Sequence, residues 1–176
     1  STPEKERTIT SEERFGETIP VKTPTTIHAL LQFDNGALVT LGASWDVWDH
    51  GHPHIELYGT EGALRIPDPN IFSGELQISS RDGGFDPVPK WDHPFGIENE
   101  EYDTGWIANY RSAGLADLAR AIREGREARC LIQRPLHAVE VMTTILQSAE
   151  TGRVIEMVTT CTRPDPLGPE DAKTLI

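Results

Sequence analysis

The sequence lacks the features that mark several common classes of protein. Its only two cysteines, Cys130 and Cys161, have the spacing of neither a zinc site nor a disulfide framework, so a reducing, cytoplasmic setting is expected. No run approaches the roughly 20 apolar residues needed to span a bilayer. Residues 1–7 are polar and lack the apolar segment of a secretory signal.

Positive charge is also scarce. The 176 residues include 16 Lys or Arg against 28 Asp or Glu, which gives a net charge of −12. Such a chain repels nucleic-acid phosphates and anionic membrane surfaces on average, so neither is expected as a partner. A hydrophobic content of 37% is enough for one domain core. The first residue is Ser1 rather than Met, so we expect a fragment or a processed chain.

Motifs that bind nucleotides or carry out catalysis are absent as well. No G-x-G-x-x-G follows a predicted strand and opens a helix, and there is no phosphate loop, G-x-S-x-G elbow or H-E-x-x-H. The glycines of Gly59–Gly62 lie between two predicted strands, where they serve turn geometry. We therefore expect no dinucleotide site and no catalytic residue in this chain.

Alternating hydrophobicity predicts strands in the first half of the chain. Residues 26–33 alternate with a period of two, as a strand with one buried face does. Asp34–Gly36 links this strand to residues 37–47, and its Asn-Gly pair supplies the positive φ values of a tight antiparallel hairpin. Residues 54–58 and 63–66 predict a second hairpin.

Helical periodicity appears later. A first helix has an apolar stripe between Leu115 and Ile122 and ends at Gly125, a residue favoured just after a helix. A second helix has Pro135 in its first turn and ends at Gly152. Residues 153–158 predict a final strand.

These elements together predict an α+β domain. A fifth strand is expected at 75–79, and residues 80–106 form a long irregular connection of a kind that often carries function. Because hairpins come first and helices later, we expect an open-faced, predominantly antiparallel β-sheet with helices packed on one face, and no Rossmann domain. The domain should cover residues 23–160, after a flexible entry segment or edge strand at 1–22 and before an extended tail at 161–176.

Candidate binding residues gather in a segment rich in tryptophan and histidine. Trp45 and Trp48 offer flat apolar faces of the kind that stack on sugar rings. Asp46, His50 and His52 offer groups beside them that bind hydroxyls. Ordinary packing or a subunit interface is the alternative explanation for the aromatic residues.

The histidines of this segment also allow a metal site. Three alternate from His50 to His54 and would share one face of an extended strand, with Glu56 as an added carboxylate. Gly51 and Pro53 disfavour a rigid ligand set there, so we predict no metal ligand.

Two further candidates precede the first predicted helix. Asn109 and Arg111 are polar residues that could contact a ligand. The alternative is that they only open the helix, with Asn109 as its cap, since asparagine is a favoured capping residue. Both remain substrate-facing candidates.

Several segments of the chain resemble the C-terminal domain of the Gfo/Idh/MocA family. The most specific is E-L-Y-G-T-E-G at Glu56–Gly62, because a hydrophobic strand, a glycine turn and an acidic residue occur together. Further similar segments are residues 23–26, 33–37, 44–48, 67–70, 114–119, 137–142 and 163–164.

The resemblance implies one half of a two-domain enzyme. In this family, which includes glucose-fructose oxidoreductase and inositol dehydrogenase, an N-terminal Rossmann domain binds NAD or NADP and the open sheet of the second domain commonly contacts other subunits. Members oxidise or reduce a sugar or cyclitol carbon by hydride transfer. The family's catalytic lysine, in a Glu-Lys-Pro motif, and its Asp and His motif match no position here. Because hydride transfer requires a fixed nicotinamide, we expect a substrate-binding, dimer-forming domain that is inactive alone.

Two other functions fit the same residues. One is a stand-alone interaction module that dimerises through its sheet. The other is a His-rich, metal-dependent enzyme on a β-sheet fold. A coding segment for a Rossmann domain directly upstream would discard the first, and the lack of stoichiometric metal in the purified protein would discard the second.

Overall fold

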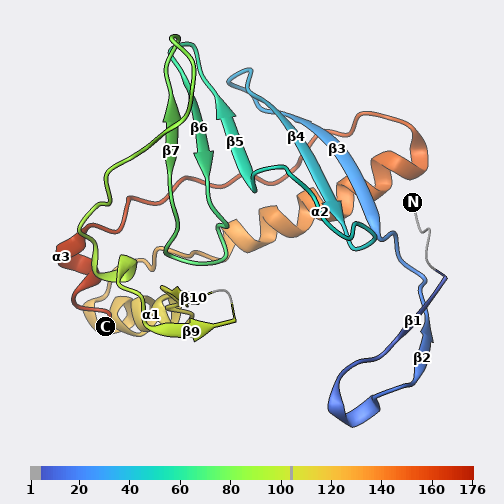
Figure 1. The fold of residues 1–176 in the computed structure, drawn as a ribbon, viewed down its shortest axis with the longest axis horizontal. Helices are drawn as coiled ribbons and strands as arrows, with labels where there is room; N and C mark the ends of the chain where they lie inside the picture. The colour runs from blue at the N-terminus through green and yellow to red at the C-terminus, as the bar shows by residue number, and fades with distance from the viewer. Residues whose placement is uncertain (1–4, 104) are drawn as a thin grey trace. The chain divides into compact units, whose positions relative to one another are not determined.

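The structure, a computed structural model, describes residues 5–103 and 105–176. The chain divides into two compact units, Ser1–Gly51 and His52–Ile176. Figure 1 shows hairpins along the first half of the chain and the α-helices in the second half. Every strand pair in the described residues is antiparallel, which confirms the α+β class and the antiparallel sheet.

The first unit consists of two hairpins. Strand β1 (Glu6–Thr8) pairs with β2 (Thr18–Pro20), and the 3-10 helix η1 (Glu12–Arg14) lies in the loop between them. Strand β3 (Thr26–Gln32) pairs with β4 (Leu38–Ser44) over its full length, as predicted from the alternating pattern.

The turn between β3 and β4 differs in detail from the predicted one. The Gly36 N–H donates to the Phe33 carbonyl over 2.8 Å, and only Gly36 has a positive φ, of 86°. Asn35 instead accepts a 3.0 Å hydrogen bond from the Ala37 N–H with its side-chain oxygen. The turn is therefore a three-residue loop in which glycine supplies the left-handed residue and asparagine supplies a hydrogen bond.

The second unit contains a four-stranded antiparallel sheet in sequential order. It comprises β5 (Ile55–Tyr58), β6 (Ala63–Ile66), β7 (Gln77–Ser79) and β8 (Asp86–Pro87). The second predicted hairpin is thus confirmed, and the fifth predicted strand is present in shortened form. Short strands of this kind need packing beyond their own ladder, because small sheets are marginally stable alone.

Gly62 is required by the sheet as well as by its turn. A Cβ atom at this position would lie 2.3 Å from the Ser79 carbonyl oxygen of β7. Any other residue at 62 would therefore push β7 away from β6. This contact gives a physical reason for the second glycine of the G-T-E-G element.

The long connection after β8 is more structured than its composition suggests. It contains the 3-10 helix η2 (Pro94–Gly96) and the hairpin of β9 (Glu100–Tyr102) and β10 (Gly105–Ile107). Phe95 of η2 is 2% exposed and stacks on Tyr110 with ring centroids 4.9 Å apart. This aromatic contact forms the core of the connection.

Three α-helices occur in the described residues: α1 (Ala113–Glu124), α2 (Gln133–Thr151) and α3 (Pro169–Ala172). Gly125 and Gly152 end the first two in the left-handed conformation, with φ values of 65° and 66°, as predicted. The short helix α3 lies within the predicted tail and packs against η2.

The predicted strand at 153–158 is wrong. These residues adopt no regular structure and are held by helix α2 instead. The Glu140 carboxylate accepts hydrogen bonds from the backbone N–H of Val158, over 2.6 Å, and of Thr159, over 2.8 Å. The Glu140 carboxylate therefore supplies the acceptors that a neighbouring strand would otherwise provide.

The apolar stripes of the two long helices are exposed. On α1, Leu115, Leu118 and Ile122 are 69%, 46% and 74% exposed. On α2, Val139 and Met142 are exposed as well. Both helices therefore present apolar faces that the described residues of their own unit leave exposed.

Phe95 gives a first test of this packing. Phe95→Ala is expected to lower the free energy of unfolding by about 3–5 kcal/mol, because it removes a fully buried ring and leaves a cavity. Chemical denaturation measures the change. Phe15→Ala is the matched control, since Phe15 is exposed in the first unit, and it should change stability little. Equal losses in the two variants would contradict the assignment of Phe95 to the core.

Candidate functional site

The seven residues predicted to face a substrate are divided between the two units. Trp45, Asp46, Trp48 and His50 belong to the first unit, and His52, Asn109 and Arg111 belong to the second. Each group is therefore described within its own unit.

The tryptophans of the first unit project into solvent. Trp45 is 80% exposed and Trp48 is 100% exposed. The His50 backbone N–H donates to the Asp49 carboxylate over 2.7 Å, which fixes the chain just after the tryptophans. The flat faces of both indoles are accessible to a sugar ring or to another protein surface.

Asp46 is part of the structural framework. Its Oδ2 accepts hydrogen bonds from the hydroxyls of Thr26, over 2.6 Å, and Thr25, over 2.7 Å. Its Oδ1 lies 3.5 Å from an Arg7 guanidinium nitrogen. The bonds from Thr26 and Thr25, helped by Arg7, hold the pKa of Asp46 below its ordinary value. The ionised carboxylate therefore joins β1, the start of β3 and the end of β4.

Asn109 and Arg111 also make internal contacts. The Asn109 backbone N–H donates to the Asn99 side chain over 2.7 Å, and its side-chain amide donates to Glu100 over 2.5 Å. Arg111 donates to the Asn70 side chain over 3.0 Å. The predicted role of Asn109 as a helix cap is wrong, because the N-cap position of α1 is occupied by Ser112.

The structure gives no support to a metal centre. Across residues 5–103 and 105–176, no three His, Cys, Asp or Glu side chains are grouped closely enough to hold a metal ion.

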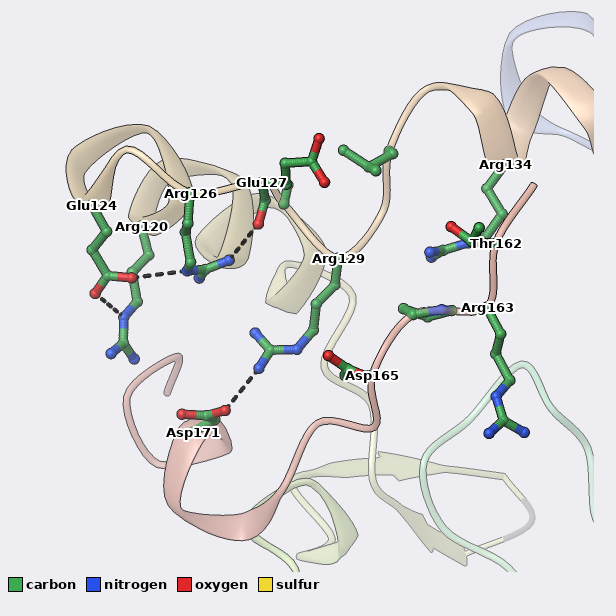
Figure 2. Close-up of a pocket in the computed structure, with 13 residues that line it drawn as sticks. Arg120, Glu124, Arg126, Glu127, Arg129, Arg134, Thr162, Arg163, Asp165 and Asp171 are labelled. Carbon is green, nitrogen blue, oxygen red and sulfur yellow. Dashed lines mark hydrogen bonds and ion pairs between the residues drawn. The ribbon is translucent and has the colours of Figure 1, made fainter.

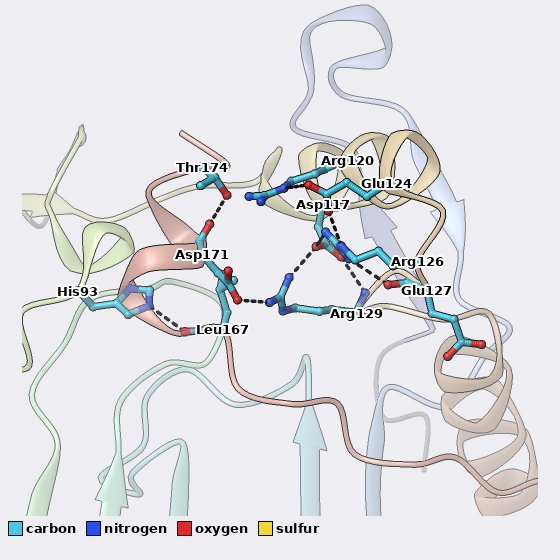
Figure 3. Close-up of polar contacts among 10 residues, drawn as sticks. All are labelled: His93, Asp117, Arg120, Glu124, Arg126, Glu127, Arg129, Leu167, Asp171 and Thr174. Carbon is cyan, nitrogen blue, oxygen red and sulfur yellow. Dashed lines mark hydrogen bonds and ion pairs between the residues drawn. The ribbon is translucent and has the colours of Figure 1, made fainter.

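A charged cluster centred on Asp117 was not predicted (Figure 3). Asp117 is buried on α1, and its Oδ1 accepts a 2.8 Å bond from each of Arg126 and Arg129. Its Oδ2 accepts the backbone N–H of Arg129 over 2.7 Å. A second Arg129 nitrogen reaches Asp171 of α3 over 2.8 Å. One buried carboxylate therefore links α1, the connection to α2 and, through Arg129, the tail.

Opposing effects act on the pKa of Asp117. Burial alone would raise it, because burial disfavours the charged form. The Arg129 backbone N–H and the guanidinium groups of Arg126 and Arg129 outweigh burial and hold the pKa below its ordinary value. Asp117 is therefore ionised throughout the neutral range.

Glu124 extends the cluster to the surface. Its carboxylate accepts from Arg120 over 2.6 Å and from Arg126 over 2.9 Å. The hydrogen bonds from Arg120 and Arg126 lower the pKa of Glu124. The sequence held one signal of this cluster: an aspartate, Asp117, placed within the apolar pattern of α1 and followed by arginines.

A cavity of about 500 Å³ lies beside this cluster, between the α1–α2 connection and residues 162–165 of the tail (Figure 2). Its arginines are Arg120, Arg126, Arg129, Arg134 and Arg163. The first three form the ion pairs already described. The wall of the cavity is therefore rich in guanidinium groups and is held in place by the Asp117 cluster.

The fold and these contacts define a class of protein: an α+β domain with antiparallel sheets, exposed apolar helix faces and no nucleotide-binding motif in its sequence. A family model described as "Oxidoreductase family, C-terminal alpha/beta domain" matches residues 2–157. The chain therefore belongs to the C-terminal domains of the Gfo/Idh/MocA oxidoreductase family, which confirms the resemblance seen in the sequence.

The remaining comparisons add no relatives. None of the curated proteins and none of the solved structures compared with the chain matches it. Among the described residues, no helix combines the length and the apolar character needed to cross a membrane.

Asp117→Asn tests the charged cluster. The substitution keeps the shape of the side chain but removes the charge that pairs with Arg126 and Arg129, and it places an N–H donor against their N–H groups. We expect the free energy of unfolding to fall by about 2–4 kcal/mol, measured by urea denaturation at neutral pH. Glu124→Gln, which alters the exposed end of the cluster, should cause a smaller loss.

The free energy of unfolding of the native protein and that of Asp117→Asn should depend differently on pH. Because folding lowers the pKa of Asp117, its stabilisation is fully present above the ordinary aspartate pKa of 3.8 and is lost as the pH falls through the lower value of the folded protein. The stability difference between the native protein and Asp117→Asn should therefore shrink in acid. A difference that stays constant down to pH values well below this range would contradict the ion-pair assignment.

Proposed function

We propose that this chain is the substrate-binding and oligomerisation domain of an NAD(P)-dependent oxidoreductase that acts on a sugar, cyclitol or related polyol by hydride transfer. Membership of the oxidoreductase family supports the reaction class. The lack of a dinucleotide fingerprint in the sequence supports a nucleotide site on a separate Rossmann domain. Under this proposal the chain contributes no catalytic residue and does not turn over substrate by itself.

The family match carries the reaction class, and the exposed apolar surface carries the part of the proposal that concerns association. Leu115, Leu118 and Ile122 line one side of α1 with much of their surface in water. Burial of such side chains contributes about 1.5–3 kcal/mol each, so an exposed stripe favours association with another surface. A Rossmann domain and a second copy of the chain are the two surfaces that the family relationship suggests.

The substrate contacts are proposed for the exposed candidates. In the first unit, Trp45 and Trp48 would stack on the ring of a sugar or cyclitol, and His50 would hydrogen-bond its hydroxyls. His52, Asn109 and Arg111 belong to the second unit and are proposed as substrate-facing residues of that unit by itself. The domain itself is proposed to cover residues 23–160, and its cysteines are free, as a reducing cytoplasm would keep them.

Restoring the upstream coding region tests the reaction. We expect the full-length protein to reduce NAD or NADP with at least one sugar or cyclitol, followed by the absorbance of the reduced nicotinamide. Trp48→Ala should raise KM for that substrate by about 3- to 10-fold through lost stacking. Trp91→Ala is the matched control, because Trp91 is exposed outside the candidate segment. Absence of turnover with every sugar, cyclitol and polyol tried, with either nucleotide, would refute the proposed reaction.

The oligomerisation role has a separate test. Leu30 and Leu38 lie on one face of the β3–β4 hairpin, by register, and are 70% and 65% exposed. Replacing both with Lys should weaken self-association by about tenfold or more, because two apolar contacts are lost and charge is added. Sedimentation velocity measures the effect, with Phe15→Lys as the control. A native protein that stays monomeric at high micromolar concentration would overturn this role.

A further inference from the structure

Arg134 has an unusual position among the arginines of the cavity. It is the second residue of α2 and is half-buried, and its Nε is shielded from solvent with no hydrogen-bond acceptor among the described residues. Each of Arg120, Arg126 and Arg129 has a carboxylate partner. The Nε of Arg129 is shielded in the same way, but the other nitrogens of Arg129 donate to Asp117 and Asp171. A shielded N–H without an acceptor is costly, since buried polar groups are nearly always hydrogen-bonded.

The surroundings of Arg134 combine hydrogen-bond donors with the apolar side chain of Leu131 and the carboxylate of Glu127, which line both hollows. Thr162 and Arg134 line both the 500 Å³ cavity and an adjoining hollow of about 330 Å³, which Gln133 and Thr160 also line. Hydroxyl and amide groups can donate to the same acceptor as the guanidinium. Figure 2 shows the Arg134 guanidinium turned toward Thr162, whereas Arg163 points away from the other arginines.

The electrostatic setting favours a negative ligand. Helix α2 begins at this point without a side-chain cap, so its positive dipole end faces the same region. Asp165 and Glu127 are the acidic lining residues that have no ion pair with the arginine cluster, and Figure 2 shows the Glu127 carboxylate pointing away from Arg129.

We propose that this cavity binds a small molecule through an oxyanion group, a carboxylate or a phosphate, held by Arg134. A guanidinium donates two parallel hydrogen bonds to either group, and the Thr162 hydroxyl would supply a third donor. Both hollows fall within the size range of small-molecule sites. None of the seven substrate-facing candidates lines the cavity, so the site is additional to the proposed function.

A bound ligand should restrain the tail, because the tail forms part of the cavity wall. Residues 162–165 form one wall, and two contacts fix the tail beyond them: Arg129 with Asp171 over 2.8 Å, and His93 with the Leu167 carbonyl over 3.0 Å. An anion that bridges Arg134 and Thr162 would join α2 to this wall. Amide hydrogens on both sides should then exchange more slowly.

The full-length protein is titrated with inorganic phosphate and, separately, with acetate and citrate, at constant ionic strength set with sodium chloride. Calorimetry measures affinity, and hydrogen–deuterium exchange mass spectrometry follows peptides that cover residues 127–134 and 158–165. We expect saturable binding of phosphate or of a carboxylate, with slower exchange in both peptides. The preferred probe identifies which oxyanion the site takes. Arg134→Gln should weaken binding about tenfold or more.

Arg123→Gln is the matched control, because it removes the same charge from an exposed position of α1 that does not line the cavity. Equal weakening in both variants would show general electrostatic attraction and overturn the site. The site is also overturned if no probe slows amide exchange in the two peptides of the native protein. This measurement does not require the Arg134→Gln variant to fold. Turnover of polyols is not used as a readout, so failure here is distinguishable from failure of the proposed reaction.

Discussion

The second unit depends on one buried carboxylate. Asp117 is ionised inside the protein, where a charge is tolerated only if it is paired and hydrogen-bonded. Arg126 and Arg129 meet that requirement, and Arg129 also reaches Asp171. The positions of α1, of its connection to α2 and of the tail are thus fixed by a single set of ion pairs, and the wall of the arginine cavity is fixed with them.

Two further carboxylates hold segments without regular secondary structure through hydrogen bonds. Asp46 gathers two threonine hydroxyls and an arginine in the first unit, and Glu140 binds the chain at Val158 and Thr159 in the second. Apolar packing is slight by comparison, since Phe95 is the one large side chain among the described residues that is fully buried. Part of the acidic excess of the sequence is therefore structural, and the chain should be more sensitive to acid than a domain held by its core.

The features that could be predicted from the sequence are those set by residues close together in the chain, namely hairpins and helix ends. The β3–β4 and β5–β6 hairpins follow from alternation and glycine turns, and Gly125 and Gly152 end helices because they adopt the left-handed conformation easily. The strand at 153–158 failed because Glu140, distant in sequence, supplies the acceptors instead. The Asp117 cluster was missed because two of its features arise only in the fold: the burial of Asp117 and the approach of Asp171 to Arg129.

The buried polar contacts and the exposed apolar side chains of the second unit have a common cause. Because Asp117 and Ala121 occupy the buried side of α1, its leucine stripe turns outward and is left available to another surface. Arg129 is likewise committed to Asp117 and Asp171, which leaves Arg134 as the guanidinium that can meet a ligand at the start of α2. A ligand there would act on the tail that Arg129 restrains. Binding in the cavity and docking of the tail should therefore be thermodynamically linked, each favouring the other.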